Sequence, residues 1–280
     1  MADALVIDRL SEADLPGLQT LSAEAGWNQT MDDWRIFLGA GQVFGCREAG
    51  RLLASAAILP YGAFAWISMV LVTATARRLG LGTGLLRHCI AELRRMGLVP
   101  LLDATAAGEK IYIPLGFRPL YGITRWQGQG QRSGRPDDTA VTTALPLNEA
   151  GLADAIALDA AVCGAPREGL LRSLQARAPH LALRLKQHSI LLARPGRLAT
   201  QIGPLAANDE AAAIALLQAA LARIDGPVFL DVPEQWTGIA AELQQRGFSK
   251  QRGFRRMVLD RDAGFGDPGR SFVIAGPEFG

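Results

Sequence analysis

The sequence lacks any hydrophobic run long enough to span a membrane. Its most apolar stretch, residues 63–72, is interrupted by Ser68 and is about half of the ~20 residues that a spanning helix needs. Near the N-terminus, Asp3 and Asp8 stand where a signal peptide carries basic residues. We therefore expect no membrane segment and a cytoplasmic location.

Cysteine and histidine are also scarce. The three cysteines, Cys46, Cys89 and Cys163, are an odd number without paired spacing, which argues against a disulfide framework and a thiolate zinc site. The three histidines show no spacing typical of metal ligands. The sequence therefore predicts a reducing compartment, buried cysteines and no metal.

Charge of one sign is not in excess either. The 29 Lys and Arg residues face 27 Asp and Glu residues, and a net charge of +2 is too small for general nucleic-acid binding. With 49% hydrophobic and 20% charged residues, the composition is that of a folded globular chain. A length of 280 residues suits about two domains of ~150 residues each.

Hydrophobic periodicity predicts a mixed α/β unit in the first half. Capping-box patterns indicate helices that begin at Ser11 and Thr30. Strands are expected over residues 4–10, 42–48, 51–59, 65–72, 99–105 and 117–127, and further helices over 84–96 and 108–115. Because a helix-length crossover joins 65–72 to 99–105, those two strands should run parallel beside an antiparallel meander.

A polar stretch precedes a second unit of the same kind. Residues 128–139 have almost no apolar content, so we place a linker at 128–143, between domains at 1–127 and 144–280. Helices are expected over 149–162, 167–177, 209–223 and 235–245, and strands over 189–194, 198–205, 228–232 and 248–260. In both halves a strand ending in Leu-Asp leads through a helix to Gly-Phe, which indicates two copies of one unit.

A glycine-bearing loop, Arg77-Arg78-Leu79-Gly80-Leu81-Gly82-Thr83, precedes an amphipathic helix. Glycines let the backbone approach a ligand, free N–H groups at a helix start attract an anion, and arginine adds positive charge. The loop therefore indicates a pyrophosphate site, with a tight structural turn as the alternative. Its glycine spacing differs from the dinucleotide-binding fingerprint.

Two motifs give the chain a family resemblance. Arg77-x-x-Gly80-x-Gly82 is similar to the acetyl-coenzyme A pyrophosphate motif of the GNAT superfamily of N-acetyltransferases, and Tyr112, four residues before Gly116-Phe117, matches its second signature. The whole chain, including residues 102–105 and 275–280, resembles a bacterial subgroup with a second, GNAT-like C-terminal domain. The resemblance implies an α/β (α+β) fold of two tandem GNAT-like domains, each a mixed, mostly antiparallel sheet flanked by helices.

The resemblance also implies acetyl transfer from acetyl-coenzyme A to a primary amine by direct attack in a ternary complex, without a metal. A backbone donor within residues 69–71, preferably of Val70 or Leu71, would stabilise the negative charge on the thioester oxygen. Tyr112 is the candidate acid for the departing thiolate, with packing under the cofactor as the alternative. The candidate cofactor-binding residues are Val70, Leu71, Val72, Arg77, Arg78, Leu79, Gly80, Gly82, Thr83 and Tyr112.

The acceptor side is less defined. An ammonium group must lose a proton before it attacks, and the unranked candidates for the base are Glu24, Asp32, Asp33 and Glu48. The candidate substrate residues are Trp27, Asp33 and Trp34; core packing and a helix-start charge are the alternatives. Asp103, at a strand end, is as well suited to cap the next loop as to take part in catalysis.

The second half lacks both motifs. Its loop before the helix at Asp209 is Ala206-Ala207-Asn208, without a glycine pair or an arginine, and Leu243 stands where the first half has Tyr112. We therefore expect a degenerate domain that shapes the acceptor pocket and does not bind coenzyme A. The arginines considered for that pocket, with an exposed surface position as the alternative, are Arg167, Arg255 and Arg256.

The sequence thus predicts an N-acetyltransferase for a small-molecule amine, as a monomer or homodimer, with neither nucleic acid nor membrane as partner. The alternatives are a non-catalytic acyl-coenzyme A sensor or regulatory protein and a protein N-acetyltransferase. The presence of Tyr112 favours the enzyme. An open, acid-lined groove would favour a protein substrate.

Overall fold

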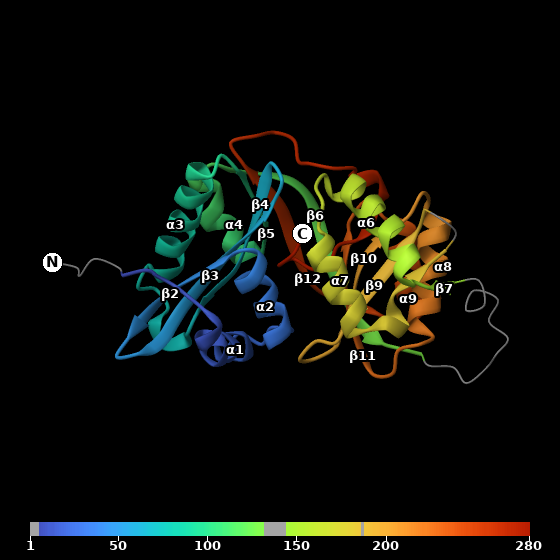
Figure 1. The fold of residues 1–280 in the computed structure, drawn as a ribbon, viewed down its shortest axis with the longest axis horizontal. Coiled ribbons are helices and arrows are strands. Elements are labelled where there is room, and N and C mark those ends of the chain that lie inside the picture. The colour runs from blue at the N-terminus through green and yellow to red at the C-terminus, as the bar shows by residue number, and fades with distance from the viewer. Residues whose placement is uncertain (1–5, 132–143, 186–187) are drawn as a thin grey trace.

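One continuous mixed sheet runs through both halves of the chain, with helices packed along it (Figure 1). The computed structural model describes residues 6–131, 144–185 and 188–280. Within these ranges the strands are β1 (Asp8–Arg9), β2 (Gln42–Glu48), β3 (Arg51–Tyr61), β4 (Phe64–Val72), β5 (Val99–Ala104), β6 (Phe117–Gln129), β7 (Leu145–Pro146), β8 (Leu183–Arg184), β9 (Ile190–Arg194), β10 (Thr200–Ala206), β11 (Pro227–Pro233), β12 (Ser249–Leu259) and β13 (Ser271–Val273).

Helices and 3-10 turns connect these strands. The α-helices are α1 (Leu15–Glu24), α2 (Met31–Ala40), α3 (Leu81–Arg95), α4 (Ala106–Tyr112), α6 (Glu149–Cys163), α7 (Glu168–Arg177), α8 (Glu210–Leu221) and α9 (Thr237–Gln245), and the 3-10 turns are η1 (Glu12–Asp14), η2 (Ala74–Ala76), η3 (Ile113–Leu115), η4 (Pro179–Leu181) and η5 (Pro268–Arg270). Capping boxes are present at Ser11 and Thr30, as predicted. Across the described ranges, no helix combines the length and the hydropathy of a membrane span.

Most predicted strands are confirmed within one or two residues at each end. Strand β2 has the expected bounds, and the parallel pairing predicted from the crossover is present between β4 and β5. Strands β8 and β13 were not predicted, because two or three residues are too few to show an alternating pattern. Residues 132–143, most of the predicted linker, lie outside the described residues, so the boundaries at 127 and 144 stay a prediction.

The two halves exchange strands at the centre of the sheet. The order is β1-β2-β3-β4-β5-β12-β6-β11-β10-β9-β8-β7, with β13 paired to β10. Strand β12, from the end of the chain, therefore lies between β5 and β6 of the first half, and β6 lies between β12 and β11 of the second (Figure 1). Each half thus depends on a strand of the other for its sheet.

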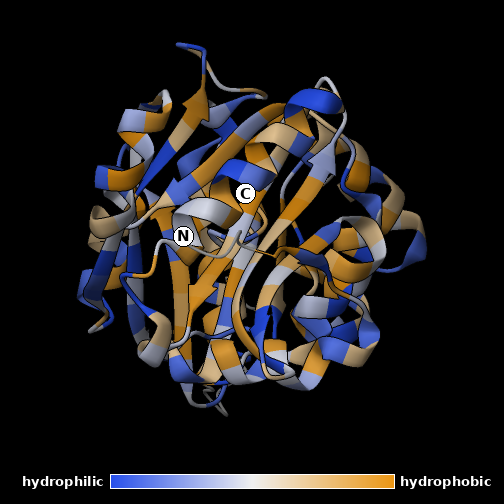
Figure 2. Ribbon diagram, turned by 90° about the vertical axis from the view of Figure 1, so that its left-hand side faces the viewer, coloured by the Kyte–Doolittle hydropathy of each residue, from blue (hydrophilic) through white to orange (hydrophobic). Residues whose placement is uncertain are grey.

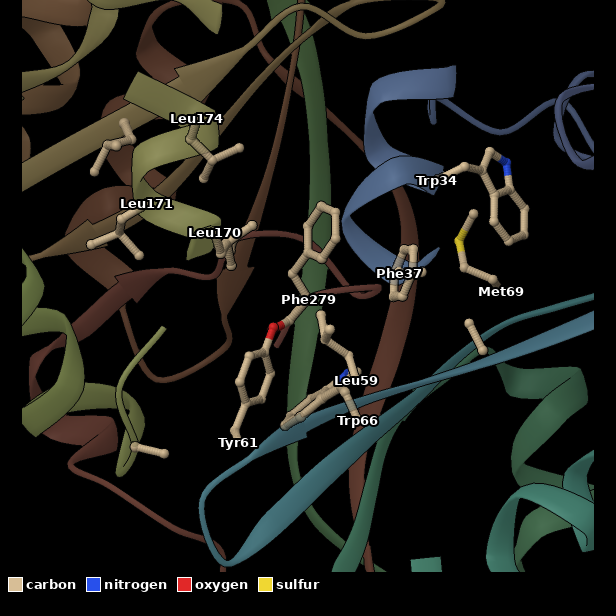
Figure 3. Packing of buried hydrophobic residues seen from close by; sticks show 14 of the residues in the cluster. Trp34, Phe37, Leu59, Tyr61, Trp66, Met69, Leu170, Leu171, Leu174 and Phe279 are labelled. Carbon is tan, nitrogen blue, oxygen red and sulfur yellow. The ribbon is translucent and has the colours of Figure 1, made fainter. Parts of the chain in front are cut away.

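A shared hydrophobic core joins the halves behind this exchange. Figure 2 shows hydrophobic residues along strands of the sheet. Phe279, near the C-terminus, is fully buried between the first half and α7 (Figure 3), and its ring stacks on that of Phe37 at 5.2 Å. The hydroxyl of Tyr61 donates to the carbonyl oxygen of Phe279 at 3.1 Å, and the indole N–H of Trp66 donates to that of Pro277 at 3.0 Å. The C-terminal segment is therefore part of the first half's core.

Candidate active site

A cavity opens where strands β4 and β5 separate. Their parallel pairing extends from Phe64 and Val99 to Trp66 and Leu101. The residues that follow on both strands line the cavity, together with the α1–α2 connection, the end of α4, strands β6 and β12 and the C-terminal segment. Because of the strand exchange, residues of the second half form one wall of this cavity.

Strand β4 carries a bulge at the edge of the cavity. Met69 has a left-handed backbone (φ 54°), and β4 has one residue more than β3 between the pairs Ala57–Ser68 and Ser55–Leu71. The Ser55 hydroxyl donates to the Met69 carbonyl oxygen at 3.0 Å and holds this geometry. Strained backbone and bulges concentrate at functional sites because they redirect polar groups. Met69 and Val70 line the cavity, whereas Leu71 and Val72 do not.

Tyr112 reaches the same cavity from the end of α4. The helix begins at Thr105, whose side-chain oxygen accepts the Gly108 N–H at 3.2 Å. The Tyr112 ring folds back onto Gly108, where a Cβ atom would lie 2.9 Å from the ring. Burial raises the pKa of Tyr112 above 10, so its hydroxyl is protonated at neutral pH. No described residue forms a hydrogen bond with that hydroxyl, which is therefore available to a ligand.

The glycine-bearing loop connects β4 to α3. Arg78 and Gly80 have left-handed backbones (φ 67° and 79°), and Gly80 occupies the N-cap of α3 without a side-chain cap. The backbone N–H groups in the first turn of α3 therefore donate no hydrogen bond to an N-cap side chain. Arg77, Arg78 and Leu79 are exposed. These features are those expected of an anion site at a helix N-terminus.

Gly82 has no role in the fold that requires a glycine. Its backbone is helical, and a Cβ atom there would lie 3.4 Å from Val72 Cγ2, an ordinary contact distance. Glycine at this position weakens the helix relative to alanine by about 0.5–1 kcal/mol. Close approach of an external group to the loop is a physical reason for a glycine here.

Four charged side chains line the cavity, and three of them are paired. Asp103 accepts two hydrogen bonds from the Arg256 guanidinium, both at 2.9 Å. Arg125 donates two hydrogen bonds to Asp231, both at 2.8 Å. Burial raises the pKa of Glu278 more than its arginine partner lowers it. The pairs are Asp103 with Arg256, Arg125 with Asp231, and Glu278 with Arg194. Arg252 is the fourth, and no described residue forms an ion pair with it.

Of the three candidate substrate residues, only Trp27 lines the cavity. Trp34 is fully buried in the core and its indole N–H donates to the Ser22 hydroxyl at 3.0 Å. Asp33 is also buried; it accepts the Thr30 N–H at 2.8 Å and pairs with two second-half arginines. The placement of Trp34 and Asp33 in an acceptor pocket is therefore corrected: they pack the core and join the halves.

The other proposed bases are also remote from the cavity. Glu24 accepts hydrogen bonds from the Thr73 hydroxyl and the Ala74 N–H at 2.7–2.9 Å. Asp32 pairs with Arg35 on the surface, and Glu48 is exposed. The carboxylates that do line the cavity are Asp103 and Glu278. Glu278 was missed because nothing in a short C-terminal segment predicts that it returns to the first half.

The arginines considered for the acceptor pocket also lie elsewhere. Arg167 is buried with Asp159 and donates to the carbonyl oxygens of Phe279 and Gly280 at 3.1 and 2.7 Å. Arg256 holds Asp103, and Arg255 does not line the cavity. The second-half arginine at the cavity is Arg252, on the same strand as Arg255 and Arg256.

In the second half, the split between the parallel strands β10 and β11, which corresponds to the split between β4 and β5, is filled by another segment of the chain. Strands β10 and β11 are parallel only from Thr200–Val228 to Ile202–Leu230, and β13 then pairs with β10. The Ile274 N–H donates to the Asp231 carbonyl oxygen on β11 at 3.1 Å, so the C-terminal segment occupies the split. The Asp209 side chain caps α8 by accepting the Ala212 N–H at 2.8 Å, which places a carboxylate where α3 has Gly80.

Comparisons with known proteins agree with this architecture. A model of the acetyltransferase (GNAT) family matches residues 8–117, and a model of an acetyltransferase (GNAT) domain matches residues 155–268. A Bacillus subtilis protein called uncharacterized N-acetyltransferase YitH is 24% identical over 251 residues, which cover 86% of this chain and 87% of the relative.

Solved structures show the same fold over the full length. A putative acetyltransferase from Pyrococcus horikoshii has a TM-score of 0.83 at 18% identity, and the match covers 100% of this chain and 97% of that one. A tandem GNAT protein from the clavulanic acid biosynthesis pathway has a TM-score of 0.62 at 15% identity over 91% and 98% of the two chains. With a GNAT domain matched in each half, the chain belongs to the GNAT superfamily of N-acetyltransferases as a tandem member and is an acyltransferase.

Proposed function

We propose that the first half binds acetyl-coenzyme A and that the enzyme transfers the acetyl group to a primary amine of a small molecule held in the cavity. The observation that carries the proposal is that the Met69 bulge and Tyr112 line one cavity. The loop at residues 77–83 follows the same strand β4 and would hold the pyrophosphate. The second half would supply the far wall of the acceptor pocket.

The residues support a direct transfer. Acetyl-coenzyme A supplies an acyl group activated as a thioester. A backbone N–H beside the bulge, with Val70 as our choice, donates to the carbonyl oxygen while the amine nitrogen bonds to the carbonyl carbon. As the carbon–sulfur bond breaks, Tyr112 gives its proton to the thiolate. The nitrogen then loses its second proton, which returns through water to the tyrosinate and restores the hydroxyl.

Glu278 is our candidate for the base that takes the proton from the ammonium group. It lines the cavity with Tyr112, and a raised pKa makes its carboxylate a stronger base than an exposed glutamate. Asp103 is less suitable because both of its oxygens accept hydrogen bonds from Arg256.

The cavity favours a small acceptor over a protein side chain. Its walls come from both halves, and each of its two acidic residues is paired with an arginine, so it is not an acid-lined groove. The free hydroxyl of Tyr112 favours turnover over a sensor that only binds acyl-coenzyme A.

The test is Gly82→Glu, measured by calorimetry with acetyl-coenzyme A. A carboxylate in the first turn of α3 suits the helix dipole, so the fold should be retained, but it should repel a pyrophosphate. We expect cofactor binding to weaken at least about 100-fold, which is a loss of ~3 kcal/mol of binding free energy. The matched control is Gly169→Glu, at the second residue of α7 as Gly82 is of α3, where a Cβ atom meets nothing within 4 Å. Unchanged binding in Gly82→Glu would remove the cofactor from this loop.

A further inference from the structure

The cavity beside Tyr112 contains several buried polar atoms that lack a partner. Among the described residues, six buried side-chain nitrogen or oxygen atoms have no hydrogen-bond partner. Three of the six belong to residues that line this cavity: Gln29 Oε1, Ser68 Oγ and Arg252 Nε. Buried polar groups are seldom left unpaired, because each costs about 1–3 kcal/mol when unpaired. Their partners are therefore expected on a molecule that enters the cavity.

Arg252 is directed into the cavity by an irregularity in β12. The register with β6 passes from Lys250–Trp126 to Arg252–Arg125, so Gln251 is an extra residue on β12. A bulge of this kind shifts the following residues to the opposite face of a strand. Arg252 thus lies beside Arg125 on the cavity face, while Lys250 lies over the Trp126 ring.

The placement of Arg252 beside Arg125 is unfavourable for the protein alone. Like charges directly opposite each other on neighbouring strands are destabilising. Arg125 has its own carboxylate, since it forms a bidentate pair with Asp231, but no described residue does the same for Arg252. Burial, and then the charge of Arg125, lower the pKa of Arg252. An anion bound at Arg252 would offset both the repulsion from Arg125 and the burial of an unpaired charge.

We propose that the acceptor amine carries a carboxylate group, which binds to the Arg252 guanidinium while the amine faces Tyr112. This inference rests on the proposed function, because it names the class of acceptor for the same site. The rest of the lining is largely apolar, with side chains such as Trp27, Ile67 and Phe254. The acceptor class is therefore an amino acid or a related amino carboxylate with an apolar body.

A carboxylate suits this site better than a phosphate. The other three charged side chains of the lining are already paired, so one positive charge remains for the ligand. A carboxylate carries one negative charge, whereas a phosphate monoester carries about −1.5 to −2 at neutral pH. A planar carboxylate also matches the fork of an arginine in a bidentate pair.

The test compares amines that differ only in the carboxylate. The pairs are phenylalanine with phenethylamine, leucine with 3-methylbutylamine, and 4-aminobutyrate with propylamine; phosphoethanolamine tests the phosphate. Binding is measured by calorimetry in the presence of coenzyme A, and thiol release from acetyl-coenzyme A is measured in parallel. The variants are Arg252→Gln and, as a matched control on the same strand but outside the cavity, Arg255→Gln.

We expect the carboxylate-bearing member of at least one pair to bind about 10- to 100-fold more tightly than its partner, the range for a charge-assisted hydrogen bond. Arg252→Gln should remove that preference while the melting temperature is retained, and Arg255→Gln should keep it. Equal binding within every pair, binding of no carboxylate, stronger binding of phosphoethanolamine, or a preference that survives in Arg252→Gln would each overturn the proposal.

These results separate the inference from the proposed function. Thiol release with the amines that lack a carboxylate, without any carboxylate preference, retains the acetyltransferase activity and overturns the role of Arg252. Carboxylate-selective binding that depends on Arg252 without any thiol release retains the binding site and overturns the catalytic assignment.

Discussion

The ring of Tyr112 lies against the backbone of Gly108, four residues earlier on α4. A Cβ atom at Gly108 would be 2.9 Å from Cε2 of the ring and 3.2 Å from its hydroxyl oxygen. Residues four apart face the same side of a helix, so any larger residue at position 108 occupies the space of the ring. Gly108 therefore sets the position of the proposed acid.

Gly108→Ala should reduce activity without weakening the fold. Alanine favours the helix by about 0.5–1 kcal/mol, but its methyl group displaces the Tyr112 ring, and we expect kcat to fall by roughly 10- to 100-fold. Steady-state kinetics and thermal unfolding check this. Gly39→Ala in α2, where a Cβ atom meets nothing within 4 Å, should change stability alone. Full activity in Gly108→Ala would show that the ring position does not matter.

Tyr112→Phe should lower kcat by about 100-fold or more, the usual contribution of a positioned acid, with little effect on cofactor affinity. The control is Tyr121→Phe, which also removes the hydroxyl of a largely buried tyrosine. Unlike the Tyr112 hydroxyl, the Tyr121 hydroxyl accepts a hydrogen bond from Arg256, at 2.9 Å. Thiol release and calorimetry distinguish the two. Equal turnover of Tyr112→Phe and the parent would exclude the acid role.

The pH dependence of kcat should show a limb that belongs to Glu278. Its carboxylate must be ionised to accept a proton, and its pKa is raised, so kcat should fall with decreasing pH at a pKa above 4.5. Burial raises the pKa of Tyr112 above 10, so no basic limb from this residue is expected below that pH. Glu278→Gln should lower kcat and remove the acidic limb; an unchanged profile would assign the proton to another group.

Asp33→Ala should destabilise the protein by about 3–5 kcal/mol, because it leaves Arg177 without a carboxylate and Arg194 with Glu278 alone. Its Oδ1 lies 2.7 Å from Arg177 and 3.0 Å from Arg194. The neighbouring Asp32→Ala removes an exposed pair and should cost no more than ~0.5 kcal/mol. Urea unfolding measures both. Similar values for the two variants would mean that the inter-half pairs contribute little.

Calorimetry should give one coenzyme A per chain. In the second half β13 fills the split between β10 and β11, and the rings of Phe272 and Trp236 pack at 4.0 Å beside it. The Asp209 carboxylate at the start of α8 opposes a pyrophosphate. Two equivalent sites would show that this segment moves aside.

Local patterns predicted most of the elements because each strand or helix carries its own periodicity. Strand β2 and the parallel pair β4–β5 follow from residues 42–104 alone. The Tyr112 motif and the loop at residues 77–83 are local sequences as well; Tyr112 lines the cavity at the split, and the loop follows β4.

Long-range pairings explain what the sequence did not reveal. The exchange of β6 and β12 depends on contacts between strands more than 100 residues apart, which leave no local pattern. Asp33 looked like an ordinary first-turn acid because its partners, Arg177 and Arg194, are distant in sequence. Gly108 and Ser55 did carry signals, as a glycine inside a short helix and a serine inside an apolar strand.

The exchanged strands also constrain how the chain is made. The edge of β5 at Asp103 receives its partner Arg256 only after 153 further residues have been synthesised. Until then the first half emerging from the ribosome has an unpaired strand edge and incomplete cavity walls, a state that is prone to wrong pairing. Activity and protection from aggregation should therefore arise together, once β12 and the segment that follows it have been synthesised and have inserted.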